Sequence, residues 1–362
     1  MLLTEPIPIY GTMEGGGSYN KYAKLPAAGA ALALPLWEKT VETVELDAGD
    51  HPVVLADYGS SQGKNSLLPM QIAIKALRNR LGPGRSISVI HIDQPLNDFN
   101  TLFEVLDTDT DRYAADDANV FPSAIGRSFY ENVLPPNSVH LGWCSYAAMW
   151  LSRVPSSIPG HYMSVRSTGA VRAEFDRQAA QDWESFLSLR ANELRPGASL
   201  MVVLPGLDDD GHTELEPLFD HLNATLAEMA EEGAISATER AAMVVSAYPR
   251  RKRDLLAPFA RNGGFQHLTV EAAEMFSLPD AAWIECERDG NKEAWAAKHA
   301  SFFRSAFAPS LGSALVRVRA GDVEALRIFG DRLEAGLKSR LTTEPTALHS
   351  LVQVIVLAKR DS

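Results

Sequence analysis

An acidic residue followed by a glycine-bearing turn, in the stretch from Asp57 to Asn65, is the part of the chain best suited to hold a cofactor. The apolar residues from Val53 to Ala56 predict a buried parallel strand that ends at Asp57, and helical periodicity follows from Leu67 to Leu81. Open α/β sheets bind ligands at the carboxyl ends of their strands, where a turn of small residues lets backbone amides come close. The stretch therefore predicts a cofactor site between a strand and a helix.

A phosphate-binding loop is one interpretation of this turn. Walker loops have four residues between their two glycines, then a lysine and a hydroxyl residue that meets magnesium. Here three residues separate Gly59 from Gly63, and Asn65 follows Lys64, with Ser66 one position late. A nucleotide hydrolase that uses Gly59 to Ser66 is therefore the less favoured alternative.

A second acid gives the turn another interpretation. Residues Ser86 to Ile92 predict the next strand, which ends at Asp93. A carboxylate at that position can accept hydrogen bonds from both hydroxyls of a ribose. Each acid alone is more often a helix cap or a turn residue, but the ordered pair with a helix between them favours an adenosine-containing cofactor. This order of acid, small-residue turn and second acid is typical of nucleotide-fold methyltransferases.

Composition limits the classes of function. The chain has 362 residues, of which 46% are hydrophobic, which predicts one large globular domain with insertions or two lobes. The formal net charge of −12 argues against a nucleic-acid partner, because no basic face is visible to neutralise phosphates. Cys144 and Cys286 lack the paired spacing of a disulfide or metal site. Apolar stretches are too short to span a membrane and no signal pattern is visible, so we expect a cytoplasmic protein without a membrane partner.

Alternating apolar runs and amphipathic stretches predict an α/β fold with a helical cap. The predicted strands are 53–56, 86–92, 139–144, 200–204, 265–270 and 351–357. The predicted helices are a stretch that ends near 43, then 67–81, 172–195, several within 213–240, 292–307 and 323–341. Trp150 lies in a run that has a helical apolar pattern, and Arg250 to Arg253 predict a solvated helix start.

Several runs of the chain resemble a known family. The longest, from Phe129 to Pro155, reads FYENVLPPNSVHLGWCSYAAMWLSRVP, and Asn97 to Asn100 read Asn-Asp-Phe-Asn after Asp93. Together with the turn after Asp57 and the pair Ser18-Tyr19, these runs resemble, in the right order, those of the SABATH family of plant salicylate, benzoate and theobromine methyltransferases. The resemblance covers most of residues 10–210 and the layout of the C-terminal third.

The resemblance implies a Rossmann-like class I methyltransferase sheet with a helical cap, and S-adenosyl-L-methionine as the cofactor. The implied substrate is a small-molecule carboxylate. The implied divisions are a segment that covers cofactor and substrate (1–50), a cofactor-binding core (51–210), a helical cap (211–262), and the remainder of the core sheet with further cap helices (263–362). By resemblance alone, we also expect a homodimer.

Matching positions give the expected site residues. The residues expected to bind the cofactor are Tyr19, Asp57, Gly59, Asn65, Asp93, Gln94, Ser128, Phe129 and Ser145. Among these, Asp57, Gly59 and Asn65 would lie near its methionine part, Asp93 would hold the ribose, and Ser128 and Phe129 would flank the adenine. The residues expected to line the substrate pocket are Tyr146, Met149, Trp150 and Pro26.

Methyl transfer to a carboxylate needs no dedicated catalytic base. The cofactor's sulfonium makes the methyl group electrophilic, and a carboxylic acid with a pKa of about 4 is ionised near neutral pH. In the family, the indole N–H at the position of Trp150 helps to hold the carboxylate, so we expect substrate positioning by Trp150. A small aromatic or otherwise apolar acid is the expected substrate. The alternatives are N-methylation of a small heterocycle and a cofactor-binding protein without catalytic activity.

The chain departs from the family pattern at two positions near the substrate. Pro26 stands where the family has a glutamine that donates to the substrate carboxylate, so Lys21 or Lys24 is the expected replacement unless the substrate is presented differently. Trp143 stands where many relatives have histidine, which predicts a narrower pocket. The run from Ser246 to Pro249 lacks the asparagine with which some members hold magnesium, so we predict no structural metal.

Overall fold

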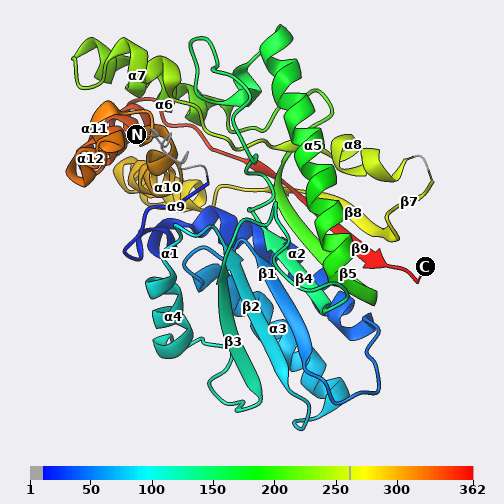
Figure 1. The fold of residues 1–362 in the computed structure, drawn as a ribbon. Helices are drawn as coiled ribbons and strands as arrows, with labels where there is room; N and C mark the ends of the chain where they lie inside the picture. The colour runs from blue at the N-terminus through cyan, green and yellow to red at the C-terminus, as the bar shows by residue number, and fades with distance from the viewer. Residues whose placement is uncertain (1–10, 261, 362) are drawn as a thin grey trace, which may run out of the picture.

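One mixed sheet, flanked by helices on both faces, forms the centre of the computed structural model, which describes residues 11–260 and 262–361 (Figure 1). Its strand order is β3-β2-β1-β4-β5-β9-β8-β7, with β6 paired to β5. Strands β1 to β5 pair in parallel, whereas β9 is antiparallel to both β5 and β8. The strands are β1 (Val53–Tyr58), β2 (Ile87–Asp93), β3 (Val120–Gly126), β4 (Val139–Ser145), β5 (Leu194–Leu207), β6 (Arg250–Arg251), β7 (Gly264–Phe265), β8 (Leu268–Leu278) and β9 (Ser350–Lys359).

The helices pack through apolar side chains against both faces of the sheet and against one another in a cap. Helices α2 and α3 pack on one face of the sheet and α5 packs on the other. A separate core joins α6, α10 and α12 into a cap beyond the carboxyl ends of the parallel strands (Figure 1). The helices are α1 (Ser18–Tyr22), α2 (Lys24–Thr43), α3 (Lys64–Leu81), α4 (Phe99–Thr108), α5 (Gly169–Glu193), α6 (Glu216–Glu231), α7 (Ala237–Ala242), α8 (Lys252–Leu256), α9 (Ala281–Asp289), α10 (Lys292–Gly312), α11 (Val316–Arg319) and α12 (Val323–Thr343), with 3₁₀ turns η1 (Ser164–Arg166) and η2 (Ala257–Phe259).

The predicted α/β fold with a helical cap is confirmed, but local predictions fail in three places. Strand β3 has no predicted counterpart, because Pro122 and its mostly exposed residues remove the apolar signal of a strand. The predicted strand at 265–270 is two strands, because Gln266 and His267, with positive φ angles of 48° and 67°, form a turn between the end of β7 and the start of β8. The run around Trp150 is an extended segment and a turn instead of a helix.

A fully buried ion pair ties the sheet to the loop that follows β3. Arg190 and Glu193 of α5 are both 0% exposed and lie 2.9 Å apart. The guanidinium donates to the carbonyls of Phe129 and Glu131, and the carboxylate accepts from the amides of Val133 and Leu134. The Tyr58 hydroxyl donates to the same carboxylate at 2.8 Å. The pair therefore fixes the 129–134 loop against β1, with every charge hydrogen-bonded.

Removing the cation of this pair should destabilise the fold strongly. We expect Arg190→Met to lower the free energy of unfolding by about 3–5 kcal/mol, because it leaves a buried carboxylate without its positive partner. Arg327→Met is the matched control, since Arg327 pairs with Glu324 and Asp331 at 57% exposure, where solvent screens the charges, and its loss should change stability far less. Urea unfolding of both variants measures the difference, and equal losses would contradict the role given to the buried pair.

Candidate functional site

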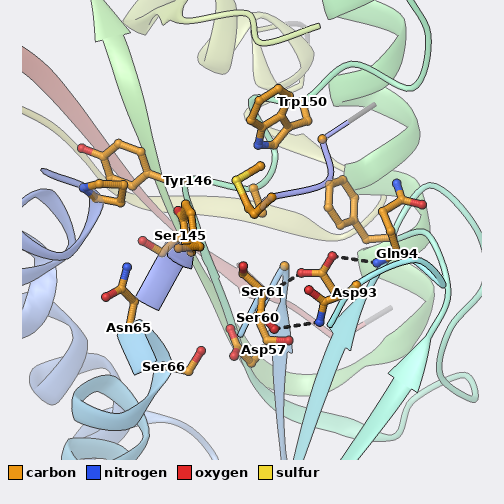
Figure 2. A pocket seen from close by; sticks show the side chains of 18 of the residues that line it. Asp57, Ser60, Ser61, Asn65, Ser66, Asp93, Gln94, Ser145, Tyr146 and Trp150 are labelled. Atoms are coloured by element: carbon orange, nitrogen blue, oxygen red, sulfur yellow. Dashed lines mark hydrogen bonds between the residues drawn. The ribbon is translucent and has the colours of Figure 1, made fainter. Parts of the chain in front are cut away.

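A cavity at the carboxyl ends of β1, β2 and β4, called the polar cavity below, is lined by the carboxylates of Asp57 and Asp93 and by serine side chains (Figure 2). Predicted cofactor residues that line this polar cavity are Tyr19, Asp57, Gly59, Asn65, Asp93, Gln94, Phe129 and Ser145. Ser128 is the predicted cofactor residue that does not line it, and its hydroxyl instead accepts from the amide of Tyr130. Residues far apart in the sequence thus meet at one sheet edge, as expected of parallel strands.

Glycine is required in the turn after β1. Gly59 has a φ of 92°, a conformation that L side chains rarely adopt, and a Cβ there would overlap the Cβ of Ala147. The turn ends at Gly63, which has a φ of 88° and precedes α3. The chain can therefore pass close to the segment after β4 and still leave the cavity open between them.

The carboxylate of Asp93 is held in place at the floor of the polar cavity. Its Oδ2 accepts from the Ser61 amide at 2.6 Å and its Oδ1 accepts from the Gln94 amide at 2.7 Å, as the dashed lines in Figure 2 mark. Burial, together with the nearby charge of Asp57, raises the pKa of Asp93 to about 6 against the lowering effect of these two amides. A carboxylate fixed by amides on one side offers its remaining lone pairs to a ligand.

Two hydroxyl groups in the turn mark the cavity as a ligand site. The side-chain oxygens of Ser60 and Ser61 are buried, and within the described residues neither has a hydrogen-bond partner. Buried hydroxyls are seldom left without a partner, so these two fit a polar ligand. Both serines lie in the predicted turn between Gly59 and Gly63, and no role was predicted for them. No local signal distinguishes them from ordinary turn residues.

The N-terminal segment covers this turn. The Gly16 amide donates to Asp98 at 2.8 Å, and Asn20 Nδ2 donates to the Gln62 carbonyl at 2.9 Å. Gln62 Nε2 in turn donates to the Glu14 carbonyl at 2.7 Å. These bonds hold α1 against the turn, with Tyr19 in the lining of the polar cavity.

The lysine that suggests a phosphate-binding loop lies elsewhere. Lys64 Nζ donates to Asp109 at 2.7 Å and to Asp111 at 3.3 Å, and Lys64 does not line the polar cavity. The cavity instead has the two carboxylates of Asp57 and Asp93. This placement removes the cation that a nucleotide hydrolase would need at the turn.

A second cavity, called the apolar cavity below, adjoins the polar cavity. Both are lined by Met13, Tyr19, Pro26, Tyr146 and Trp150, so the predicted substrate residues lie at the junction. Met149 lines the apolar cavity only. Most of its wall was not predicted and comes from the cap and from other distant segments: Leu25, Met163, Pro205, Thr213, Leu215, Phe219, Pro249, Phe302, Phe303, Ala306 and Phe307.

The segment from Tyr146 to Ser152 separates the two cavities and is bonded along its length. The Tyr146 amide donates to Val203, the Met149 carbonyl accepts from the Tyr248 amide, and both bonds measure 2.8 Å. At its end, Asp182 accepts from the amide of Ser152 at 2.8 Å and from its hydroxyl at 2.6 Å.

Two further contacts fix the middle of this segment. Arg250 Nη1 donates to the Ala148 carbonyl at 2.7 Å, and the Tyr130 hydroxyl donates to the Trp150 carbonyl at 2.8 Å. The prediction of a solvated helix start at Arg250 is therefore wrong, because this side chain is buried and donates both to the Ala148 carbonyl of the segment and to the Ala179 carbonyl of α5. Its neighbours from Lys252 onward do begin α8.

The region around Pro26 lacks the expected replacement donor. Lys21 lies 4.8 Å from the centre of the Tyr22 ring, and neither Lys21 nor Lys24 lines the polar or the apolar cavity. Of the two alternatives for this position, this arrangement favours a substrate that is presented differently over a replacement by Lys21 or Lys24. Trp143 is buried in the wall of the polar cavity, where its ring lies 5.1 Å from that of Trp37. Trp143 lines the polar cavity and not the apolar one, so a narrower substrate pocket stays a prediction.

Two features are absent from the part of the chain that the structure describes. In residues 11–260 and 262–361, no three His, Cys, Asp or Glu side chains gather as metal ligands would. None of the helices in the same ranges is both long and apolar enough to cross a bilayer. The run from Ser246 to Pro249, where some family members hold magnesium, pairs with the segment from Tyr146 to Ser152 through a bridge between Trp150 and Ala247.

Known proteins resemble this chain in sequence and in fold. The family profile described as SAM dependent carboxyl methyltransferase matches residues 11–360. A methyltransferase of a Fusarium species is 30% identical over 249 residues, and this chain spans 65% of its length. The salicylate carboxymethyltransferase of Clarkia breweri is 28% identical over 296 residues, which cover 77% of this chain and 79% of that protein. A structure of loganic acid methyltransferase with SAH has a TM-score of 0.74 at 22% identity, over 97% of this chain and 99% of that one, and so shares the fold.

Proposed function

The chain belongs to the family of S-adenosylmethionine-dependent carboxyl methyltransferases, and we propose that it esterifies a small apolar acid by direct methyl transfer. The observation that carries this proposal is the junction of a polar, acidic cavity with an apolar one at Tyr19, Tyr146 and Trp150. A cofactor in the first cavity and an acid in the second would meet at that junction.

The distribution of charge supports both assignments. Asp57 and Asp93 line the polar cavity, and carboxylates there suit a cofactor that carries an ammonium and a sulfonium group. The residues described around the apolar cavity include no Lys, Arg, His, Asp or Glu. An acid bound there would have only neutral donors from the protein, so its apolar body is what the walls recognise.

The residues that would hold the cofactor fit its parts. The Asp93 carboxylate, fixed by two amides, would accept from the ribose hydroxyls. The Ser60 and Ser61 hydroxyls, which lack partners among the described residues, would donate to the cofactor's carboxylate. Phe129 would flank the adenine. When bound, S-adenosylmethionine supplies an electrophilic methyl group.

The contribution of the protein is to position the acid and exclude water. We propose that Trp150 donates its indole N–H to the substrate carboxylate, and Figure 2 shows the indole above the cavity with its nitrogen on the cavity side. Tyr19 also lines both cavities, whereas the hydroxyl of Tyr146 packs against Gly29 of α2. A carboxylate is already ionised near neutral pH, so no residue has to remove a proton. Positioning of this kind can supply effective molarities of about 10⁵ M.

N-methylation of a heterocycle is the second candidate, because an uncharged apolar cavity without the family's glutamine also accepts a neutral ring. Radiolabelled S-adenosylmethionine and a panel of aromatic and aliphatic acids distinguish the two. We expect a labelled product that loses its label in base, as a methyl ester does. A base-stable label would indicate N-methylation, and cofactor binding without any turnover would indicate a protein that only binds. ATP hydrolysis without binding of S-adenosylmethionine would favour the nucleotide hydrolase.

The proposed role of Trp150 predicts a selective loss. Trp150→Phe keeps the ring against Phe307, which it contacts edge-on at 6.0 Å, but removes the N–H donor. We expect kcat/KM for the acid to fall about tenfold or more, with an unchanged Kd for S-adenosylhomocysteine, because a charged acceptor loses one hydrogen bond. Trp283→Phe is the matched control, since the Trp283 indole donates to Glu287 outside both cavities. Equal effects of the two substitutions would contradict the assignment.

The pKa of Asp93 predicts how cofactor affinity depends on pH. Ribose hydroxyls donate best to the ionised carboxylate, so binding favours the deprotonated form. With the pKa raised to about 6 by burial, affinity should be full above about pH 7 and fall as the pH drops through 6. We expect the Kd of S-adenosylhomocysteine to rise about fivefold to tenfold from pH 7 to pH 5, measured by calorimetry. Asp93→Asn should bind weakly with a flat profile, and a profile unchanged by that substitution would assign the titration to another group.

Assembly as a homodimer and a cytoplasmic location remain predictions from the sequence. Size-exclusion chromatography with light scattering measures the first directly.

A further inference from the structure

A buried imidazole contacts one of the two carboxylates of the polar cavity. Asp57 of β1 and His91 of β2 are register partners in neighbouring parallel strands, so their side chains lie on the same face of the sheet. His91 Nδ1 lies 2.9 Å from Asp57 Oδ2, and the two side chains are 0% and 2% exposed. On the other side of the ring, His91 Nε2 lies 2.8 Å from the hydroxyl of Tyr113.

The chemistry of the three groups fixes the direction of the hydrogen bonds. A carboxylate can only accept, so Nδ1 must carry a hydrogen and donate to Asp57. With the ring neutral, Nε2 then accepts from the Tyr113 hydroxyl. Burial and the charge of Asp57 both raise the pKa of Tyr113, which keeps that hydroxyl protonated. Tyr113 thus selects the histidine tautomer that Asp57 requires, as a second hydrogen-bonding partner does for other histidines.

The two acids of the cavity are supported in different ways. Asp93 is held by the backbone amides of Ser61 and Gln94, which no substitution of a side chain removes. Among the described residues, His91 is the hydrogen-bonding partner of the Asp57 side chain. Asp57 therefore depends on one imidazole for its orientation, and a buried carboxylate without that donor is costly to keep charged.

Resting on the proposed function, we propose that His91 and Tyr113 are positioning residues for the amino-acid half of the cofactor. They fix Asp57 Oδ2 so that the other carboxylate oxygen faces the polar cavity and accepts from the cofactor's ammonium group. Asp93 serves the ribose independently. The protein then recognises the two halves of its cofactor through separately supported acids, and His91 acts on one half only.

Two ligands distinguish this role from a general structural one. S-Adenosylhomocysteine carries the amino-acid half, whereas 5′-methylthioadenosine has the adenosine and the thioether without it. By calorimetry at pH 7.5, we expect His91→Leu to raise the Kd of S-adenosylhomocysteine about tenfold, and that of 5′-methylthioadenosine less than about twofold. Asp93→Asn is the matched control and should weaken both ligands together.

A conservative variant tests the donor itself. The amide nitrogen of Asn occupies roughly the place of Nδ1 in His, so His91→Asn should recover most of the affinity for S-adenosylhomocysteine. Tyr113→Phe, which keeps the ring, should raise the Kd of S-adenosylhomocysteine about threefold and leave the Kd of 5′-methylthioadenosine unchanged. This variant tests the proposal if His91→Leu does not fold. Equal losses for both ligands, or no loss, would overturn the proposal. Failure of the unaltered protein to bind either ligand would instead refute the cofactor assignment.

Discussion

Both cavities depend on the backbone between Tyr146 and Ser152, which follows β4 and is fixed from several directions. Hydrogen bonds reach this segment from β5, from residues 246–248, and from the side chains of Arg250, Tyr130 and Asp182. On one side, Ala147 approaches Gly59 so closely that no side chain fits at that glycine. On the other side, Met149 and Trp150 face the apolar cavity. A segment held in this way can fix the position of a cofactor relative to an acid, and direct methyl transfer requires such a fixed, short separation of the reacting atoms.

The division of charge follows from this geometry. Acidic side chains gather at the ends of β1 and β2, under the N-terminal segment, whereas the cap helices supply phenylalanine and alanine. The polar side favours a cation and the apolar side gives an anion no positive partner of its own. An acid bound there therefore gains electrostatic stabilisation only next to the cofactor. In an apolar setting that attraction is weakly screened, and water that would compete for the carboxylate is excluded.

The sequence predicts the parts of the site that are local to one strand and turn. Asp57, Gly59 and Asp93 follow apolar runs whose pattern reveals a parallel sheet, and the class of the sheet then places them at one edge. Phe219, Phe303 and Phe307 escape prediction because they belong to helices that face the pocket only after the cap folds back over the sheet. Arg250 misleads for a related reason, since a basic run indicates solvent unless buried carbonyls accept from it.

The central claim is that cofactor and acid meet at the junction of the two cavities. A crystal structure with S-adenosylhomocysteine and an acid that the protein methylates tests this claim most directly. We expect the ribose hydroxyls at about 3 Å from the Asp93 carboxylate, and the acid's carboxylate between the thioether sulfur and the indole nitrogen of Trp150. A nucleoside bound away from Asp93, or an acid bound outside the apolar cavity, would contradict the claim.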